Sequence, residues 1–439
     1  MKIFFLLIGI FISLCPAQLP AIEFGSTRNP VGAGSRGNGM GGSHLSIADE
    51  SCGMSWNSGA IIQQEELFEL SIATLIYSRL EKISMGDNPA GNGNNNVSDI
   101  TFSYVGIVST FEQLGKNMSV GISYQHLYDL NRHLRFPYEE NGFAIRRENW
   151  SYEQRGNLST VGLTYCIELI RPSLSFGLTF NFWKDSLSPN QWTQYYKMNG
   201  NVEYGATQLT LDHQKTEEYT FDGYNMNFGL LWHVNYKLSL GAVLKTPFNA
   251  DIEHKIYGRH IELNHTTSET RITPIEEKIY NEQLKMPLSY GIGMVYRWTD
   301  LFYISLDIHK THWNNYIYTY DNGNQTSAVS NKNISESGIR PTHQVRMGCE
   351  YMIINKYKKT AIPIRAGLFY DPAPAEKNPD DYYGFSLGTG YIKNDIGSID
   401  IAYVYRFGNN VGASMLEDVD FSENIQEHMV HVSLVSYFY

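Results

Sequence analysis

Large apolar residues alternate with small or polar residues along most of this chain. The segment 174–182 reads Leu-Ser-Phe-Gly-Leu-Thr-Phe-Asn-Phe, and the same alternation returns at 288–294, 302–308 and 399–403. Successive side chains of a β-strand point to opposite faces, so the pattern predicts strands with one apolar and one polar face. The polar face also carries charged residues. A wall that is apolar on one side and wet on the other is typical of a transmembrane β-barrel.

The alternation predicts about fourteen strands, most of them long enough for a tilted strand to cross a membrane. They span 67–80, 98–112, 117–130, 153–168, 172–185, 221–234, 236–249, 283–297, 301–315, 341–354, 361–371, 382–393, 396–407 and 427–439. Short connections alternate with long ones at 81–97, 131–152, 186–220, 250–282, 316–340, 372–381 and 408–426. Outer-membrane barrels have short periplasmic turns and long outer loops. We therefore predict an all-β fold, a transmembrane antiparallel β-barrel of about 14 strands, over residues 67–439.

The residues before the first predicted strand fall into two segments. Residues 1–17 have the features of a secretory signal peptide, with Lys2 followed by an apolar run that is too short to span a bilayer. We expect cleavage after Ala17, with Ala21 as the second choice. Residues 22–66 are rich in glycine and lack the alternation. A segment of this size at the head of a barrel is expected to form a compact plug inside the lumen.

The remaining sequence shows no recognisable chemistry. The net charge of −11 and the lack of a basic patch argue against nucleic acid as a partner. Three cysteines remain after cleavage, and none has metal-ligand spacing. The histidines His254, His260 and His265 share one predicted loop, and we interpret them as solvated side chains. We find no defensible catalytic motif, and therefore predict no enzyme activity, no cofactor and no metal site.

Several stretches of the chain resemble the FadL/TodX family of outer-membrane transporters. The segment 36–43 (Arg-Gly-Asn-Gly-Met-Gly-Gly-Ser), the triplet 47–49 and the segment 56–61 (Trp-Asn-Ser-Gly-Ala-Ile) are similar to the N-terminal hatch of that family. The family usually has Pro-Ala where this chain has Ser58-Gly59. Further similar stretches are 241–248, 286–293 and 364–374. The resemblance covers the mature chain in the right order and implies a fourteen-stranded barrel with a hatch.

The resemblance implies passive transport of hydrophobic small molecules, either long-chain fatty acids or aromatic hydrocarbons. A ligand would be caught by the outer loops, enter a pocket in the barrel, trigger movement of the hatch and leave sideways into the membrane. The expected partners are outer-membrane lipid, the ligand and the barrel insertion machinery, with the protein a monomer. Two alternatives remain: a shuttle in type IX-like protein secretion, or a structural surface barrel with a permanent plug. An apolar lumen pocket and a gap in the wall would favour transport.

Candidate ligand-binding residues come from two places. The loop 186–220 offers an aromatic landing surface, whereas the loop 250–282 is too polar for long alkyl chains. The predicted landing residues are Trp192, Tyr195, Tyr196 and Met198, and interface anchoring or loop packing is the alternative interpretation. The wet face of the strands carries charged or ionisable residues, namely Glu168, Asp307, His309, Arg346, Glu350, Arg365, Asp400 and Arg406. We expect them to form ion pairs with one another and with the hatch; alternatively, Arg346 or Arg365 meets a ligand carboxylate. The predicted hatch or gate residues are Arg36, Asp49, Trp56, Asn57, Ser58 and Gly59.

Overall fold

A computed structural model describes residues 32–64, 67–86, 88–142, 144–394, 396–414 and 420–438. The predicted signal peptide and its cleavage sites lie outside the described residues, as does the start of the predicted plug. The strands are β1 (Phe68–Met85), β2 (Gly93–Gln113), β3 (Lys116–Asp129), β4 (Arg132–Asn141), β5 (Ile145–Ile170), β6 (Leu174–Trp183), β7 (Asn190–Tyr204), β8 (Thr207–His233), β9 (Leu238–Lys245), β10 (Phe248–Asn264), β11 (Glu269–Met286), β12 (Ser289–Thr299), β13 (Phe302–Thr311), β14 (Ile317–Thr319), β15 (Gln325–Ser327), β16 (Thr342–Asn355), β17 (Thr360–Tyr370), β18 (Tyr382–Lys393), β19 (Gly397–Val411) and β20 (Phe421–Phe438). The helical elements are α2 (Ser35–Gly39), α3 (Gly53–Trp56), η1 (Ile61–Gln63), η2 (Pro89–Gly91) and η3 (Trp313–Asn315).

The strands form one antiparallel sheet that closes on itself. β1 pairs with β2 on one side and with β20 on the other, from Phe68 opposite Phe438 to Met85 opposite Phe421. Several consecutive strands, such as β3 with β4 and β9 with β10, continue one another in a single pass of the wall. When strands that continue one another are counted as one, the barrel has fourteen strands, which confirms the predicted fold. Closure pairs most of the membrane-spanning wall on both sides of each strand, although the pairing of β2 with β3 begins only at Tyr104 opposite Gln125.

The outer surface of the barrel carries a band of exposed apolar side chains. Ile100, Ile292 and Leu368 are 70%, 62% and 64% exposed. Beyond this band the outward positions become polar, as at Asp251 and Glu253. The band is the lipid-facing surface, because an apolar belt is what the hydrocarbon core requires of a barrel. No helix in the described ranges is long and apolar enough to cross a membrane.

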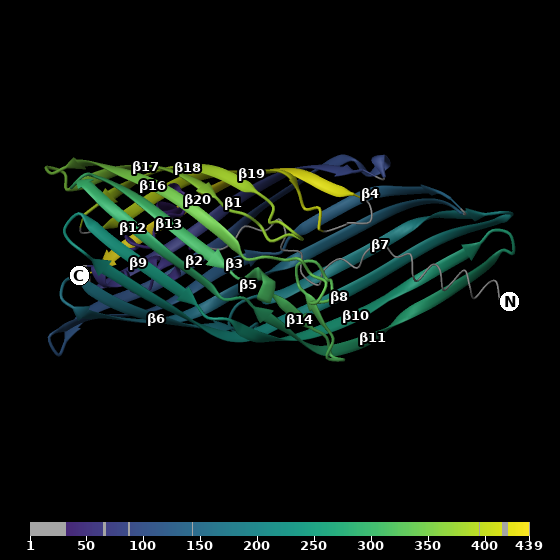
Figure 1. Cartoon of the computed structure of the whole chain (residues 1–439), viewed down its shortest axis with the longest axis horizontal. Coiled ribbons are helices and arrows are strands. Elements are labelled where there is room, and N and C mark those ends of the chain that lie inside the picture. Colours follow the sequence, from purple (N-terminus) through teal and green to yellow (C-terminus); the bar gives the residue numbers. More distant parts are fainter. Residues whose placement is uncertain are drawn as a thin grey trace.

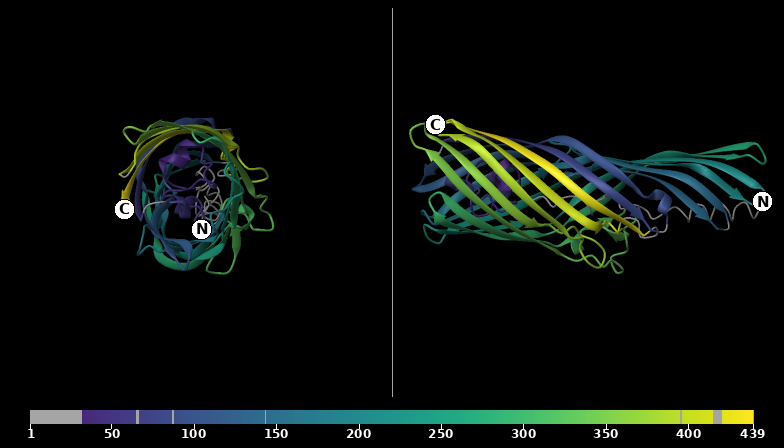
Figure 2. Two further views of the ribbon diagram at one scale, coloured as in Figure 1. Left: turned by 90° about the vertical axis from the view of Figure 1, so that its left-hand side faces the viewer. Right: turned by 90° about the horizontal axis from the view of Figure 1, so that it is seen from above.

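Several of the predicted outer loops are wrong, among them 131–152, which is mostly β4 and the start of β5. The predicted loop 186–220 is mostly β7 and the first half of β8, and the predicted loop 250–282 is mostly β10 and β11. Together with β4 and the start of β5, these strands form a wall that rises past the apolar band on one side of the barrel (Figures 1 and 2). We call it the outer wall. Its polar residues suggested loops, but solvated strands tolerate them because neighbouring strands satisfy the backbone hydrogen bonds.

The described part of the predicted plug lies inside the barrel. Residues 32–64 form two short helices and a 3₁₀ turn, and the strands surround them (Figure 2, left). Most of these residues are buried, although few of them are large and apolar. The plug is therefore held by close contact with the wall.

Candidate functional site

The plug rests on glycines of the barrel wall. Gly177 in β6 and Gly229 in β8 are register partners. A Cβ on Gly177 would lie 2.2 Å from the carbonyl carbon of Ser58, and a Cβ on Gly229 would lie 2.3 Å from Oδ1 of Asn57. Such distances are far inside van der Waals contact, so a side chain at either position would displace the plug.

Two further register pairs of glycines lie under the plug. They are Gly241 with Gly293, and Gly348 with Gly367. A Cβ on Gly241 would lie 2.5 Å from the carbonyl oxygen of Leu45, and one on Gly367 would lie 2.2 Å from the amide nitrogen of Gly41. We call the three pairs the glycine seats. They bring plug backbone against wall backbone at three places around the lumen.

The predicted hatch residues 56–59 hold the plug together and fix it to one seat. The indole N–H of Trp56 donates to the carbonyl of Ala33 at 2.7 Å. The side-chain amide of Asn57 donates to the carbonyls of Leu45 (2.7 Å) and Leu230 (3.0 Å), so it joins two parts of the plug to β8. The carbonyl of Gly59 accepts a hydrogen bond from the hydroxyl of Ser175 in β6 at 2.6 Å.

A buried carboxylate holds the middle of the plug. Oδ2 of Asp307 in β13 accepts the backbone N–H groups of His44 (2.7 Å) and Leu45 (3.0 Å). Nearby, the hydroxyl of Ser305 donates to the carbonyl of Ser43 at 2.9 Å. Asp307 thus binds two consecutive backbone N–H groups and is one of the anchors of the plug.

A charge network joins the plug to the half of the wall formed by β16 to β19. Arg36 pairs with Asp49 within the plug and lies 3.4 Å from Glu350 of β16. Arg365 in β17 pairs with Glu350 and with Asp400 of β19. The structure thus brings charged residues of the wet face together with one another and with Arg36 of the predicted hatch.

The second candidate arginine is also paired. Arg346 lies 3.0 Å from Asp371 and donates to the carbonyl of Gly41 in the plug at 3.1 Å. Arg406 shares Asp371 (3.2 Å) and also pairs with Glu427 at 2.8 Å. A ligand carboxylate would therefore have to replace an existing partner at Arg346 or Arg365.

Three of the four predicted landing residues face the inner side of the outer wall. Trp192 is 1% exposed and stacks on Tyr219, with ring centroids 4.6 Å apart and planes 7° from parallel. Tyr196 packs against Tyr152, and Met198 lies in a separate apolar cluster. Tyr195 points the other way and is 45% exposed.

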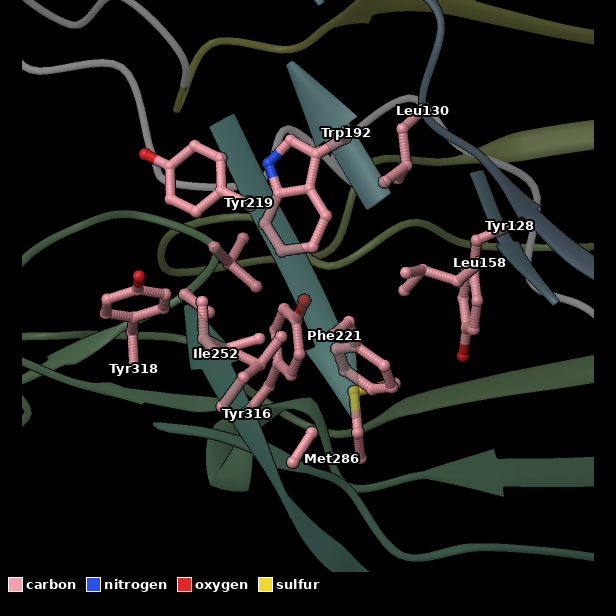
Figure 3. Close-up of a cluster of buried hydrophobic side chains, with 14 of the residues drawn as sticks. Tyr128, Leu130, Leu158, Trp192, Tyr219, Phe221, Ile252, Met286, Tyr316 and Tyr318 are labelled. Carbon is pink, nitrogen blue, oxygen red and sulfur yellow. The ribbon is translucent and has the colours of Figure 1, made fainter. Parts of the chain in front are cut away.

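Trp192 belongs to a larger group of buried apolar side chains in the outer half of the lumen (Figure 3). We call it the aromatic cluster; its members are Tyr128, Leu130, Leu158, Trp183, Trp192, Tyr219, Phe221, Ala250, Ile252, Leu284, Met286, Trp313, Tyr316, Tyr318, Ala328, Val329 and Ile339. Most of these residues were missed, because Tyr219 and its neighbours stood next to or inside predicted loops. The signal that could have found them is the alternation itself, which continues through Trp192, Gln194 and Tyr196.

A cavity of about 80 Å³ borders the aromatic cluster inside the barrel. Trp183, Met286 and Trp313 of the cluster line one part of it. Polar side chains line the rest, among them Asn181, Asn225, Asn227, Lys245, His309 and Gln344. On β13, His309 is only two residues from Asp307, which anchors the plug. The cavity therefore lies next to both the aromatic cluster and the strand that anchors the plug.

A second cavity of about 80 Å³ lies where the wall is interrupted. The register between β2 and β3 stops at Tyr104 opposite Gln125, although β2 continues outward to Gly93. Ser103 is skipped in the β1–β2 register, and Leu127 is skipped in the β3–β5 register. Both residues line this cavity, together with Gly32 and Ala33 of the plug. The cavity thus joins the plug to the place where the pairing of β2 with β3 ends.

One histidine predicted as a solvated loop residue is buried in the outer wall. His254 in β10 stacks on Tyr219, and its Nδ1 lies 2.8 Å from Oε2 of Glu282. Its Nε2 lies 3.7 Å from Glu217. Burial alone would lower the pKa of His254, but the two carboxylates outweigh burial and raise that pKa above its ordinary value. His254 therefore links β10 to carboxylates of β8 and β11.

We expect the stability of the outer wall to fall as the pH rises above neutrality. A raised pKa stabilises the fold fully below the ordinary histidine value of about 6.5, and this contribution is lost as the pH passes the raised folded value. The urea midpoint, followed by tryptophan fluorescence, should therefore be higher at pH 6 than at pH 9. His254→Gln should remove most of that difference. An unchanged pH dependence in this variant would contradict the assignment.

Comparisons with known proteins agree with this architecture. Residues 154–433 match the model of the family described as outer membrane protein transport protein (OMPP1/FadL/TodX). Similar solved structures include a Pseudomonas aeruginosa FadL homologue (TM-score 0.59, 14% identity, 96% of this chain and 100% of that one). The CymD monoaromatic hydrocarbon channel is also similar (TM-score 0.57, 13% identity, 94% of this chain and 99% of that one). So is the Pseudomonas putida toluene transporter TodX (TM-score 0.55, 11% identity, 94% of this chain and 100% of that one). A search of the curated proteins found no match.

Proposed function

Because this chain belongs to the OMPP1/FadL/TodX family of outer-membrane transport proteins, we propose that it carries small, neutral, aromatic molecules inward across the outer membrane by passive diffusion. The observation that carries the proposal is the arrangement of the aromatic cluster, a small cavity and the plug along the lumen. An aromatic cluster borders a small cavity, and the strands β6, β8 and β13 that line the cavity also contact the plug. The proposed path needs no chemical step and no energy source.

Three features favour a small neutral ligand over a long-chain fatty acid. The aromatic cluster offers ring faces, on which aromatic molecules pack well. The cavity of about 80 Å³ is small beside the roughly 150 Å³ that holds benzene in an engineered apolar site, so it admits at most part of a single ring without rearrangement. Arg346 and Arg365, which could bind a carboxylate, are already paired.

The path begins on the inner face of the outer wall. Trp192, Tyr196 and Met198 provide the landing surface there, and the predicted Tyr195 is not part of it because it faces outward. Movement of the plug off its glycine seats would then connect the first cavity to the second. The hatch residues 56–59 act as the gate in this proposal, because they fix the plug to the seat on β6 and β8.

We place the exit sideways, between β2 and β3. The end of their register at Tyr104 and Gln125 lies at the second cavity, and the exposed apolar band covers the outer surface of both strands. An apolar ligand gains free energy on entering lipid directly, since it avoids a passage through water. A barrel that closes within one chain also supports the expectation of a monomer.

Uptake by whole cells tests the proposal. A Gram-negative host without its own transporters of this type would express the protein, and uptake of labelled toluene would be compared with uptake of labelled oleate. We expect faster toluene uptake than in the empty host. Ser103→Leu, which fills the second cavity, should reduce uptake several-fold, whereas Ser98→Leu at an exposed position of the same strand should not.

The charged half of the lumen is the observation that favours the main alternative, a surface barrel with a permanent plug. In that case neither compound would enter faster than in the empty host, and Ser103→Leu would behave like Ser98→Leu. Faster oleate uptake would support transport but contradict the proposed ligand class.

A further inference from the structure

Two histidines of neighbouring strands face each other on the inner side of the outer wall. His213 in β8 and His260 in β10 are register partners, so their side chains leave the sheet on the same face. Their ring centroids are 5.7 Å apart and their planes are tilted by 54°. Neither histidine has a hydrogen bond to a described residue.

This separation matches that of two imidazoles bound to one ion. A metal–nitrogen bond is about 2.0–2.1 Å long, so two imidazoles on one ion at an angle near the tetrahedral value have ring centres about 5–6 Å apart. The pair therefore needs only rotation of the rings, not movement of the strands.

A soft donor stands next to the pair. Met198 in β7 is the register partner of His213, so Met198, His213 and His260 form one row across three strands. Within the described residues no group of three or more His, Cys, Asp or Glu side chains could hold a metal. A third protein ligand would therefore be the thioether of Met198, with water as the alternative.

We propose that His213 and His260 form a transition-metal site that prefers copper, with Met198 as the third donor when the copper is reduced. Imidazole sites bind Cu²⁺ more tightly than the other divalent first-row ions, and thioether ligands select Cu⁺. The site lies on the outer wall beyond the lipid-facing band, six residues along β8 from Tyr219 of the aromatic cluster. A bound ion would also tie β8 to β10 at the entrance of the lumen.

Copper binding can be measured on the protein in detergent, without a polyhistidine tag, because a tag would bind the same ions. We expect one Cu²⁺ per barrel that survives dialysis, with an electron paramagnetic resonance spectrum showing two coupled nitrogens. His213→Ala and His260→Ala should each abolish this signal. His265→Ala is the matched control, since this histidine of the adjacent turn contacts Thr210 and should leave the signal intact.

Two more measurements complete the test. Met198→Leu should lower the affinity for Cu⁺ while leaving Cu²⁺ binding close to that of the unmodified protein. Circular dichroism and heat-dependent electrophoretic mobility should show all four variants folded, since none of the four residues lies at a glycine seat or in the charge network. Retention of the two-nitrogen signal after either His213→Ala or His260→Ala would overturn the site, as would loss of all copper on dialysis.

Discussion

Replacing Gly177 with valine should displace the plug and convert a closed barrel into an ion-conducting pore. A Cβ at this position would lie 2.2 Å from both the carbonyl carbon and the carbonyl oxygen of Ser58, and 2.6 Å from the amide nitrogen of Gly59. All three are backbone atoms, so no rotation of a side chain can relieve the overlap. The barrel itself should tolerate the change, because valine is a good strand former and its neighbours in β5 and β8 pair through the backbone.

Planar-bilayer recordings measure this effect directly. The unmodified protein should show low conductance, and Gly177→Val should show long-lived open levels. Gly93→Val in β2 is the matched control, because a Cβ at Gly93 would meet no atom within 4 Å. If Gly177→Val conducts no more than Gly93→Val while both are folded, then the contact with Ser58 does not hold the lumen closed.

The barrel could be predicted from the sequence because the alternation of apolar and polar residues is visible within each strand. An apolar residue at every second position is required wherever a strand has lipid on one side, and this holds along Leu174–Trp183 and from Ile399 to Phe407 in β19. The same rule explains where prediction failed. Near the tip of the outer wall, residues such as Arg271 and Glu277 are exposed on both faces of the hairpin, so water imposes no alternation there. A strand without an apolar face cannot be told from a polar loop by its pattern.

The site was harder to predict than the wall, because it depends on contacts between distant segments. Trp56 to Gly59 could be grouped by resemblance, but their seat on Gly177 and Gly229 follows from strand registers that no local pattern encodes. The charged residues of the wet face could be predicted because they occupy the polar positions of the alternation. Which carboxylate each arginine meets depends on the same registers, as Arg365 opposite Glu350 illustrates.

Arg365→Leu should destabilise the barrel far more than any surface substitution. The guanidinium is 1% exposed and pairs with Glu350 and Asp400, which are 2% and 3% exposed. Removing it leaves Asp400 without its cation in a buried site. The loss of one member of a buried ion pair typically costs about 3–5 kcal/mol. Arg147→Leu is the matched control: its 3.8 Å pair with Glu203 is exposed, and such pairs contribute about 1 kcal/mol or less.

Urea unfolding in detergent micelles, followed by tryptophan fluorescence, measures both variants. A second variant separates the loss of the ion pair from the cost of leaving the buried carboxylate of Asp400 without a cation. In Arg365→Leu combined with Asp400→Leu, one stranded carboxylate is gone, so part of the lost stability should return. Leucine at both positions would also place apolar side chains in a space that the charges now fill. If the double variant is no more stable than Arg365→Leu, or if Arg365→Leu costs no more than Arg147→Leu, then the buried charge network does not hold this half of the lumen together.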